Sequence, residues 1–118
     1  MIKYNDFTFI KELVPAIPYL TTKLIYSVSY IDENSLGGFA FVDDGNGVFQ
    51  GLCYGRGNWL SDELIQKAQA YARDELKAVK IYSRCNIANK KSIAIAQKTG
   101  MTIVKTGSDY VLLEVTKQ

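Results

Sequence analysis

The fold of this chain is decided by residues 61–76, which read SDELIQKAQAYARDEL. Ser61 is a favourable N-cap, and Asp62 and Glu63 place carboxylates in the first turn, where the helix dipole favours negative charge. Good helix formers fill the segment, and apolar residues recur at helical spacing, namely Leu60, Leu64, Ile65, Ala68, Ala72 and Leu76. The pattern predicts one amphipathic helix over residues 61–76.

Three strand patterns precede this helix. Residues 23–31 alternate between two faces and are rich in β-branched and aromatic side chains, and residues 38–42 and 48–54 are further strand-like runs. Residues 43–47 read DDGNG, in which Asp-Gly and Asn-Gly readily reach positive φ. We therefore expect an antiparallel meander of three strands with a hairpin at residues 43–47.

The N-terminal segment predicts two short elements. Residues 1–5 fit a first strand, and Asp6 stands where a helix N-cap would, with apolar residues at helical spacing after it. Pro15 and Pro18 stop a regular helix within a few residues.

Four further elements are expected after the long helix. Residues 79–84 predict a short strand, and Asn89 is a suitable N-cap for a second helix that ends at Gly100, a natural C′ glycine. Residues 102–106 and 109–115 then predict a closing hairpin.

This order of elements determines the fold class. A helix of this length between two strands makes them parallel neighbours through a right-handed crossover. The result is an α+β fold, a mixed sheet with helices on its faces. At 118 residues, we expect a single domain over residues 1–118.

Composition excludes several classes of function. The 14 basic and 12 acidic residues leave a net charge of +2, too small to indicate a nucleic-acid or membrane-surface partner. The chain has no histidine, which removes Ser-His-Asp, Cys-His and histidine-metal mechanisms. Cys53 and Cys85 lack metal-ligand spacing, so we expect no metal and two buried, reduced thiols. Because there is no leader pattern and no apolar run of the ~18 residues that a spanning helix needs, we expect a cytoplasmic protein.

A second informative segment, residues 89–101, reads NKKSIAIAQKTGM. It resembles the late motif of the Gcn5-related N-acetyltransferase (GNAT) superfamily, in which Asn, then Ser three residues on, then Lys-x-Gly-Phe follow the fifth strand. Asn89, Ser92, Lys98 and Gly100 match, and Met101 replaces the usual Phe. Together with the order of elements, the resemblance extends over residues 24–116.

The resemblance implies an acyl-CoA-dependent N-acetyltransferase that transfers an acetyl group to a primary amine of a small molecule or protein. In the family, acetyl-CoA lies between the splayed fourth and fifth strands, and its pantetheine pairs with the free edge of the fourth strand. Its pyrophosphate binds backbone N–H groups at the start of the next helix. The amine attacks the thioester directly, so the lack of histidine is no obstacle. The cofactor-binding residues implied here are Leu52, Cys53, Tyr54, Arg56, Gly57, Asn58, Asn89 and Ser92.

Several of these residues also have a purely structural explanation. Asn89 is an excellent N-cap, residues 56–58 have the composition of an ordinary strand-to-helix turn, and Cys53 fits a packed core.

The pyrophosphate loop departs from the family pattern. The family pattern is Arg or Gln, then any two residues, then Gly, then any one residue, then Gly or Ala. When the chain is aligned on the helix that follows, Arg56 stands at the Arg/Gln position. Trp59 then stands at the first small-residue position and Ser61 at the second. Small residues are needed there because the phosphates approach the backbone closely. Asp62 and Glu63 also repel the pyrophosphate that the dipole attracts. The loop is eroded relative to the family.

Catalytic residues remain unassigned from the sequence. Ala96 stands where many family members have a Tyr general acid, and residues 48–54 contain no Asp or Glu to serve as a general base. These departures favour an alternative, a catalytically degenerate GNAT-fold protein that acts as a binding or structural module, similar to short bacteriophage proteins. The position of Trp59 distinguishes the acetyltransferase from the degenerate module. If Trp59 packs beneath the long helix, the cofactor site is open; if it lies between the fourth and fifth strands, the site is closed. The sequence leaves open whether the protein forms a homodimer.

Overall fold

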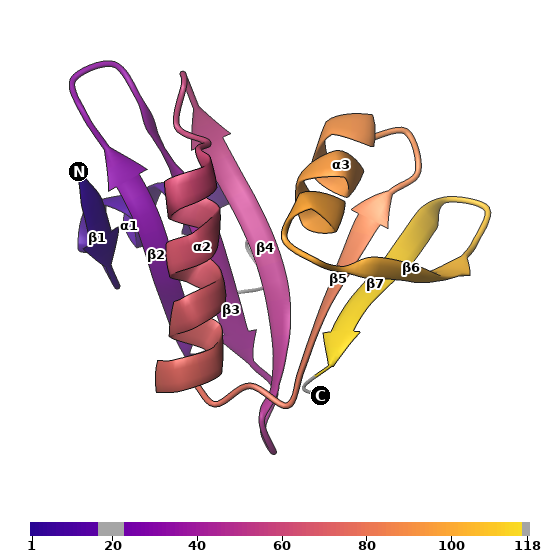
Figure 1. The fold of residues 1–118 in the computed structure, drawn as a ribbon. Helices are drawn as coiled ribbons and strands as arrows, with labels where there is room; N and C mark the ends of the chain where they lie inside the picture. The colour runs from indigo at the N-terminus through magenta and orange to yellow at the C-terminus, as the bar shows by residue number, and fades with distance from the viewer. Residues whose placement is uncertain (17–22, 117–118) are drawn as a thin grey trace.

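The computed structural model describes residues 1–16 and 23–116. Within these residues one mixed sheet of seven strands has the order β1-β2-β3-β4-β5-β7-β6 (Figure 1). The elements in chain order are β1 (Ile2–Tyr4), α1 (Phe7–Ala16), β2 (Ile25–Ile31), β3 (Leu36–Asp43), β4 (Val48–Arg56), α2 (Asp62–Ala70), the π-helical turn η2 (Tyr71–Glu75), β5 (Lys80–Asn86), α3 (Lys90–Lys98), β6 (Thr102–Thr106) and β7 (Tyr110–Thr116). The predicted α+β class and order of elements are confirmed.

The predicted elements hold with small shifts at their ends. The hydroxyl of Ser61 accepts a hydrogen bond from the Leu64 N–H at 3.1 Å, so it caps α2 as expected. The helix predicted over residues 61–76 corresponds to α2 and η2 together. The helix expected to stop near Pro15 ends one residue later, at Ala16, and Pro18 lies outside the described residues.

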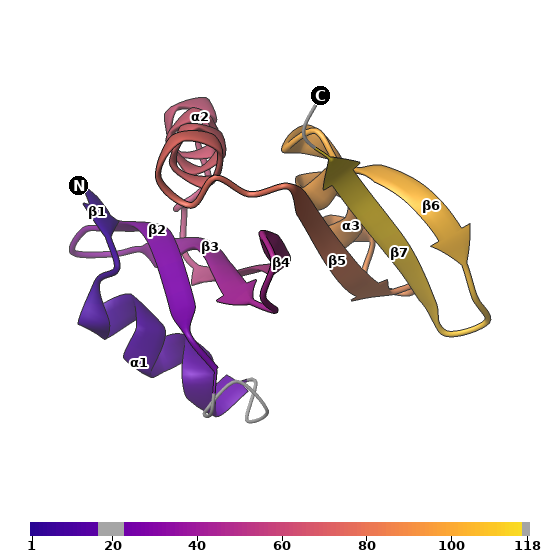
Figure 2. The same ribbon diagram turned by 90° about the horizontal axis from the view of Figure 1, so that it is seen from below.

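Helices cover both faces of the sheet (Figure 2). α1 buries Phe9 and Leu13 against one face of β3, and α2 packs on the opposite face. α3 lies on the same side as α2, because its Ile95 belongs to the same buried cluster as Leu64 of α2. Among the described residues, no helix is long and apolar enough to cross a membrane.

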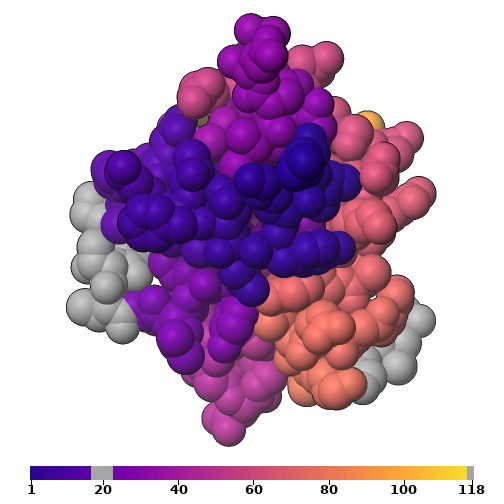
Figure 3. Space-filling view, turned by 90° about the vertical axis from the view of Figure 1, so that its left-hand side faces the viewer, coloured from indigo at the N-terminus to yellow at the C-terminus, as the bar shows by residue number. Residues whose placement is uncertain are grey.

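The N-terminal segment is attached to the end of the long helix. Asn5 donates a hydrogen bond to the Tyr71 hydroxyl at 2.9 Å, and the Tyr4 and Tyr71 ring centroids lie 5.3 Å apart. Figure 3 shows the indigo N-terminal segment beside the pink and salmon helical segment on this edge of the molecule. The edge strand β1 is therefore held by side-chain contacts as well as by its pairing with β2.

The sheet opens between β4 and β5. These parallel strands pair only at Val48↔Lys80, Phe49↔Ile81 and Gln50↔Tyr82. Beyond this point β4 continues to Arg56 and β5 to Asn86 without pairing to each other, and the two strands diverge in Figure 1. The splay implied by the family resemblance is present, and it places a gap under the facing sides of α2 and α3.

Candidate functional site

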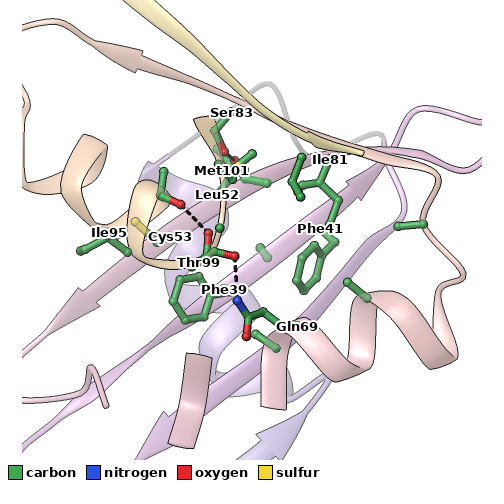
Figure 4. Close-up of a pocket in the computed structure, with 18 of the residues that line it drawn as sticks. Phe39, Phe41, Leu52, Cys53, Gln69, Ile81, Ser83, Ile95, Thr99 and Met101 are labelled. Carbon is green, nitrogen blue, oxygen red and sulfur yellow. Dashed lines mark hydrogen bonds between the residues drawn. The ribbon is translucent and has the colours of Figure 1, made fainter. Parts of the chain in front are cut away.

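A pocket of about 690 Å³ occupies this gap. Its walls come from β3, β4, β5, α2, η2 and α3, and Figure 4 shows many of its side chains. Lining residues include Gly51, Leu52 and Cys53 of β4, Ala68 and Gln69 of α2, Ala72 of η2, Ser83 and Cys85 of β5, and Ser92, Ile95 and Ala96 of α3. The gap between the strands is therefore a real slot, walled mostly by apolar groups.

The base of the slot is fixed by a buried hydrogen bond between its walls. The Ser83 hydroxyl of β5 donates to the Gly51 carbonyl of β4 at 2.6 Å, one residue beyond the last paired residues. A side chain at Gly51 would also crowd β5, because its Cβ would lie 3.0 Å from a methyl carbon of Ile81. The strands thus part just above a short polar bridge.

Two helices form the far wall and are joined across it. The Gln69 side chain of α2 donates to the Thr99 carbonyl at the end of α3, at 2.7 Å (Figure 4). The Thr99 hydroxyl in turn donates to the Ala96 carbonyl at 2.6 Å. No sequence pattern marks Gln69 or Thr99 for this contact, because it depends on how α2 and α3 pack in the folded chain.

Two thiols stand on opposite walls of the slot. Cys53 and Cys85 each lie three residues past the last β4–β5 pair, and both line the pocket. The Cys53 sulfur lies 3.9 Å from the Ser92 hydroxyl of α3. Burial raises the pKa of both thiols, and the neighbouring Cys53 raises that of Cys85 further. Both cysteines are free, as expected, and they line the slot while packing against the hydrophobic clusters beside it.

Trp59 lies beneath the long helix and outside the slot. It is 6% exposed, packs edge-to-face on Phe39 with ring centroids 5.7 Å apart, and does not line the pocket. Its indole rests on Gly37 and Gly55, which are register partners on β3 and β4. A Cβ at Gly37 would lie 2.2 Å from the indole Cγ, so the two glycines make the space that the ring occupies.

The residues expected to form the pyrophosphate loop lie away from the pocket lining. Arg56 donates to the Glu12 carboxylate of α1 at 2.8 Å, and the Asn58 N–H donates to the Ser35 hydroxyl at 3.0 Å. Gly57 has φ +75°, and a Cβ there would lie 2.6 Å from the Asn34 carbonyl oxygen. Tyr54 is also outside the lining; its hydroxyl donates to Glu12. The role of these four residues as acetyl-CoA ligands stays a prediction.

The other four predicted ligands lie together in the slot. Leu52 and Cys53 line it from β4, and Asn89 and Ser92 line it from α3 and its cap. The Asn89 side chain accepts a hydrogen bond from the Ser92 N–H at 3.1 Å, so its predicted capping role is confirmed. No cluster of three or more Cys, Asp or Glu that could hold a metal ion occurs in the described parts of the chain.

Solved structures share this architecture, whereas no protein-family model and no curated protein matches the sequence. The N-acetyltransferase PseH of Campylobacter jejuni in complex with acetyl coenzyme A aligns over 100% of both chains with a TM-score of 0.68 and 17% identity. A putative acyl-CoA N-acyltransferase of Klebsiella pneumoniae aligns over 98% of this chain and 96% of its own, with a TM-score of 0.69 and 16% identity. A GNAT-family acetyltransferase of Bacillus anthracis aligns over 78% of this chain and 65% of its own, with a TM-score of 0.61 and 18% identity.

This chain has the GNAT fold. PseH is one protein of this fold that was solved with acetyl coenzyme A.

Proposed function

We propose that the protein is an acyl-CoA-dependent N-acetyltransferase, which transfers an acetyl group from acetyl-CoA to a primary amine of a small molecule or a protein. The observation that carries this proposal is the open slot between β4 and β5, with Trp59 packed outside it. An aromatic ring in the slot would have filled the space between these two strands.

The slot has the chemistry that a pantetheine arm needs. Among the described residues, no strand pairs with β4 on its β5 side from Gly51 onward, so backbone groups of residues 52–54 are available to pair with the amides of the arm. The largely apolar walls suit the methylene groups and the thioester. Cys53, Asn89 and Ser92 supply the polar groups nearest this edge.

The slot contributes positioning rather than acid–base chemistry. No carboxylate and no tyrosine is present among its described lining residues. In the proposed reaction, the nitrogen of the neutral amine bonds to the thioester carbonyl carbon, the C–S bond breaks, and the proton that the nitrogen loses ends on the sulfur of the departing coenzyme. Holding the two reactants in an attack geometry is itself a large contribution to rate, and we assign no residue as general base or general acid.

A second candidate function is a GNAT-fold module without catalysis. It is favoured by the same lack of acid–base groups and by Asp62 and Glu63 at the start of α2, where a pyrophosphate would bind. Such a module would use the slot or the outer surface for binding only.

Calorimetric titration with acetyl-CoA, followed by an assay of coenzyme thiol release with a panel of amines, tests the proposal. We expect saturable binding and transfer. Ala96→Phe should fill the slot and abolish binding, whereas Ala94→Phe, on the exposed side of the same helix, should not. Thermal melting of both variants checks that they fold. Binding without transfer to any amine would favour the second candidate, and absence of binding at millimolar acetyl-CoA would overturn the proposal.

A further inference from the structure

The half of the sheet formed by β5, β7 and β6 has one bare face. Side chains alternate between faces along a strand, and Cys85, Val111 and Leu113 pack with α3. Their sequence neighbours therefore point to the opposite face, which none of the described helices covers. Residues on this face are Tyr82 and Arg84 of β5, and Tyr110, Leu112 and Glu114 of β7.

Arg84 stands at the edge of the slot on this bare face. It lines the pocket from β5, immediately before Cys85, and lies beyond the last β4–β5 pair. Leu52 of β4 stands across the slot on the same face, because it packs with the cluster under α1. A molecule that reaches the slot from this side passes between Leu52 and Arg84.

The guanidinium of Arg84 is held in place by an aromatic ring. Its Cζ lies 4.9 Å from the centroid of the Tyr110 ring. A cation over a ring face is stabilised by the ring quadrupole, and a stacked guanidinium keeps its in-plane N–H groups available for hydrogen bonds. The Arg84 side chain is thus exposed to solvent, but its guanidinium is held against the Tyr110 ring.

On this side of the molecule, carboxylates form ion pairs whereas the Arg84 guanidinium does not. Three carboxylates on this side have basic partners: Glu12 pairs with Arg56 at 2.8 Å, Asp44 with Lys23 at 3.1 Å and Glu114 with Lys80 at 3.0 Å. Arg84 forms no ion pair with any described residue and instead stacks on the Tyr110 ring. The slot entrance therefore offers an unpaired cation and no unpaired carboxylate among these groups.

We propose that the acceptor of this protein is an amine that also carries a carboxylate or phosphate group, which Arg84 binds at the bare face of the slot. The inference rests on the proposed acetyltransferase function. A guanidinium binds either anion through paired N–H donors, and Tyr110 holds it ready to do so. A polyamine is disfavoured, because a second ammonium group would lie beside the unpaired guanidinium.

A direct binding experiment tests the inference without any turnover. The Nε–H signal of Arg84, assigned by its loss in Arg84→Gln, is followed by NMR during titration with 3-aminopropyl phosphate, β-alanine, 3-aminopropan-1-ol and spermidine. We expect a saturable shift with the two anionic amines alone. No shift with either anionic amine, or an equal shift with the neutral amine or spermidine, overturns the inference.

A transfer assay on the same acceptors supplies the second test. Arg84→Gln should lower kcat/KM for the anionic amines by about tenfold or more, and that for 3-aminopropan-1-ol by less than about twofold. Lys105→Gln, which removes one positive charge from β6 on the same face, is the matched control and should change neither. An equal loss for charged and neutral amines in Arg84→Gln, or a preference of the wild type for spermidine, contradicts the inference. Calorimetry with acetyl-CoA separately tests the proposed function; if it shows no binding, the NMR titration still shows whether Arg84 binds an anionic amine at this site.

Discussion

The position of Trp59 decides whether the slot between β4 and β5 is open or blocked. The sequence places a bulky ring where the GNAT pattern has a small residue, and this suggests a blocked site. In the folded chain, Gly37 and Gly55 meet as register partners and leave a space that receives the indole. The substitution at the loop is thus accommodated by two glycines on neighbouring strands, and the slot is left open.

The Trp59 arrangement predicts a large effect of a small substitution. Gly37→Ala would place a Cβ 2.2 Å from the indole, and overpacking of this kind costs about 1–3 kcal/mol. Gly107→Ala is the control, because the nearest atom to its Cβ would lie at 3.4 Å. Urea unfolding followed by tryptophan fluorescence measures both. Equal free energies of unfolding for the two variants would show that the ring does not rest on Gly37.

The alkylation rates of the two slot thiols, Cys53 and Cys85, report on how far the slot shields them from solvent. Burial raises the pKa of the Cys53 thiol, the Ser92 hydroxyl only partly opposes this, and the pKa of Cys85 is raised as well. Because the thiolate is the reactive form, alkylation by iodoacetamide at pH 8 should be slower in the folded protein than in the urea-unfolded chain, and should accelerate as the pH rises.

Acetyl-CoA should slow this alkylation further at both cysteines, since both line the slot. Adenosine diphosphate at the same concentration is the control, because it lacks the pantetheine arm that would cover them. Mass spectrometry assigns the modified residue. Protection by both ligands alike, or by neither, would contradict the placement of the arm between these walls.

At the scale of elements, the start of α2 is where the proposed function places the pyrophosphate of acetyl-CoA. Ser61 caps the helix, Asp62 and Glu63 follow it, and the Asp62 carboxylate lies 3.6 Å from the Lys98 ammonium of α3. The helix dipole attracts a pyrophosphate to this end, whereas the two carboxylates repel it.

Asp62→Asn should therefore strengthen acetyl-CoA binding. A charge at a helix terminus is worth about 0.3–1 kcal/mol, which corresponds to a gain of about two- to fivefold in affinity. The affinity for S-acetylpantetheine, which lacks the pyrophosphate, should not change. Glu75→Gln removes the same charge at the far end of the helical segment and is the control. A weaker affinity for acetyl-CoA in Asp62→Asn would show that the Asp62–Lys98 pair supports the site instead.

The elements themselves could be predicted from local patterns. Helical spacing over residues 61–76 and the caps at Ser61 and Asn89 anticipate α2 and α3, because these signals act within a few residues of the chain. The partners of Arg56 and Arg84 could not be predicted in this way. Arg56 meets Glu12 and Arg84 meets Tyr110 only after distant strands and helices have packed, and no local pattern encodes such contacts.

At the scale of the whole molecule, the sheet consists of two parts joined at the short β4–β5 pairing. α2 packs on the first part, α3 on the second, and Gln69 and Thr99 join the two helices above the gap. The sequence alone predicts the crossover that makes β4 and β5 neighbours, but their separation beyond Gln50 was implied only by the family resemblance. It depends on packing on both sides of the gap, which no single segment determines.

A crystal structure of the protein grown with acetyl-CoA would show directly whether the slot between β4 and β5 receives the acyl-pantetheine arm. We predict density for the arm along the free edge of β4 at residues 52–54, the thioester between Cys53 and Cys85, and Trp59 still seated on Gly37 and Gly55. A slot that stays empty at saturating acetyl-CoA, or a ligand bound anywhere else, would show that the slot does not receive the arm.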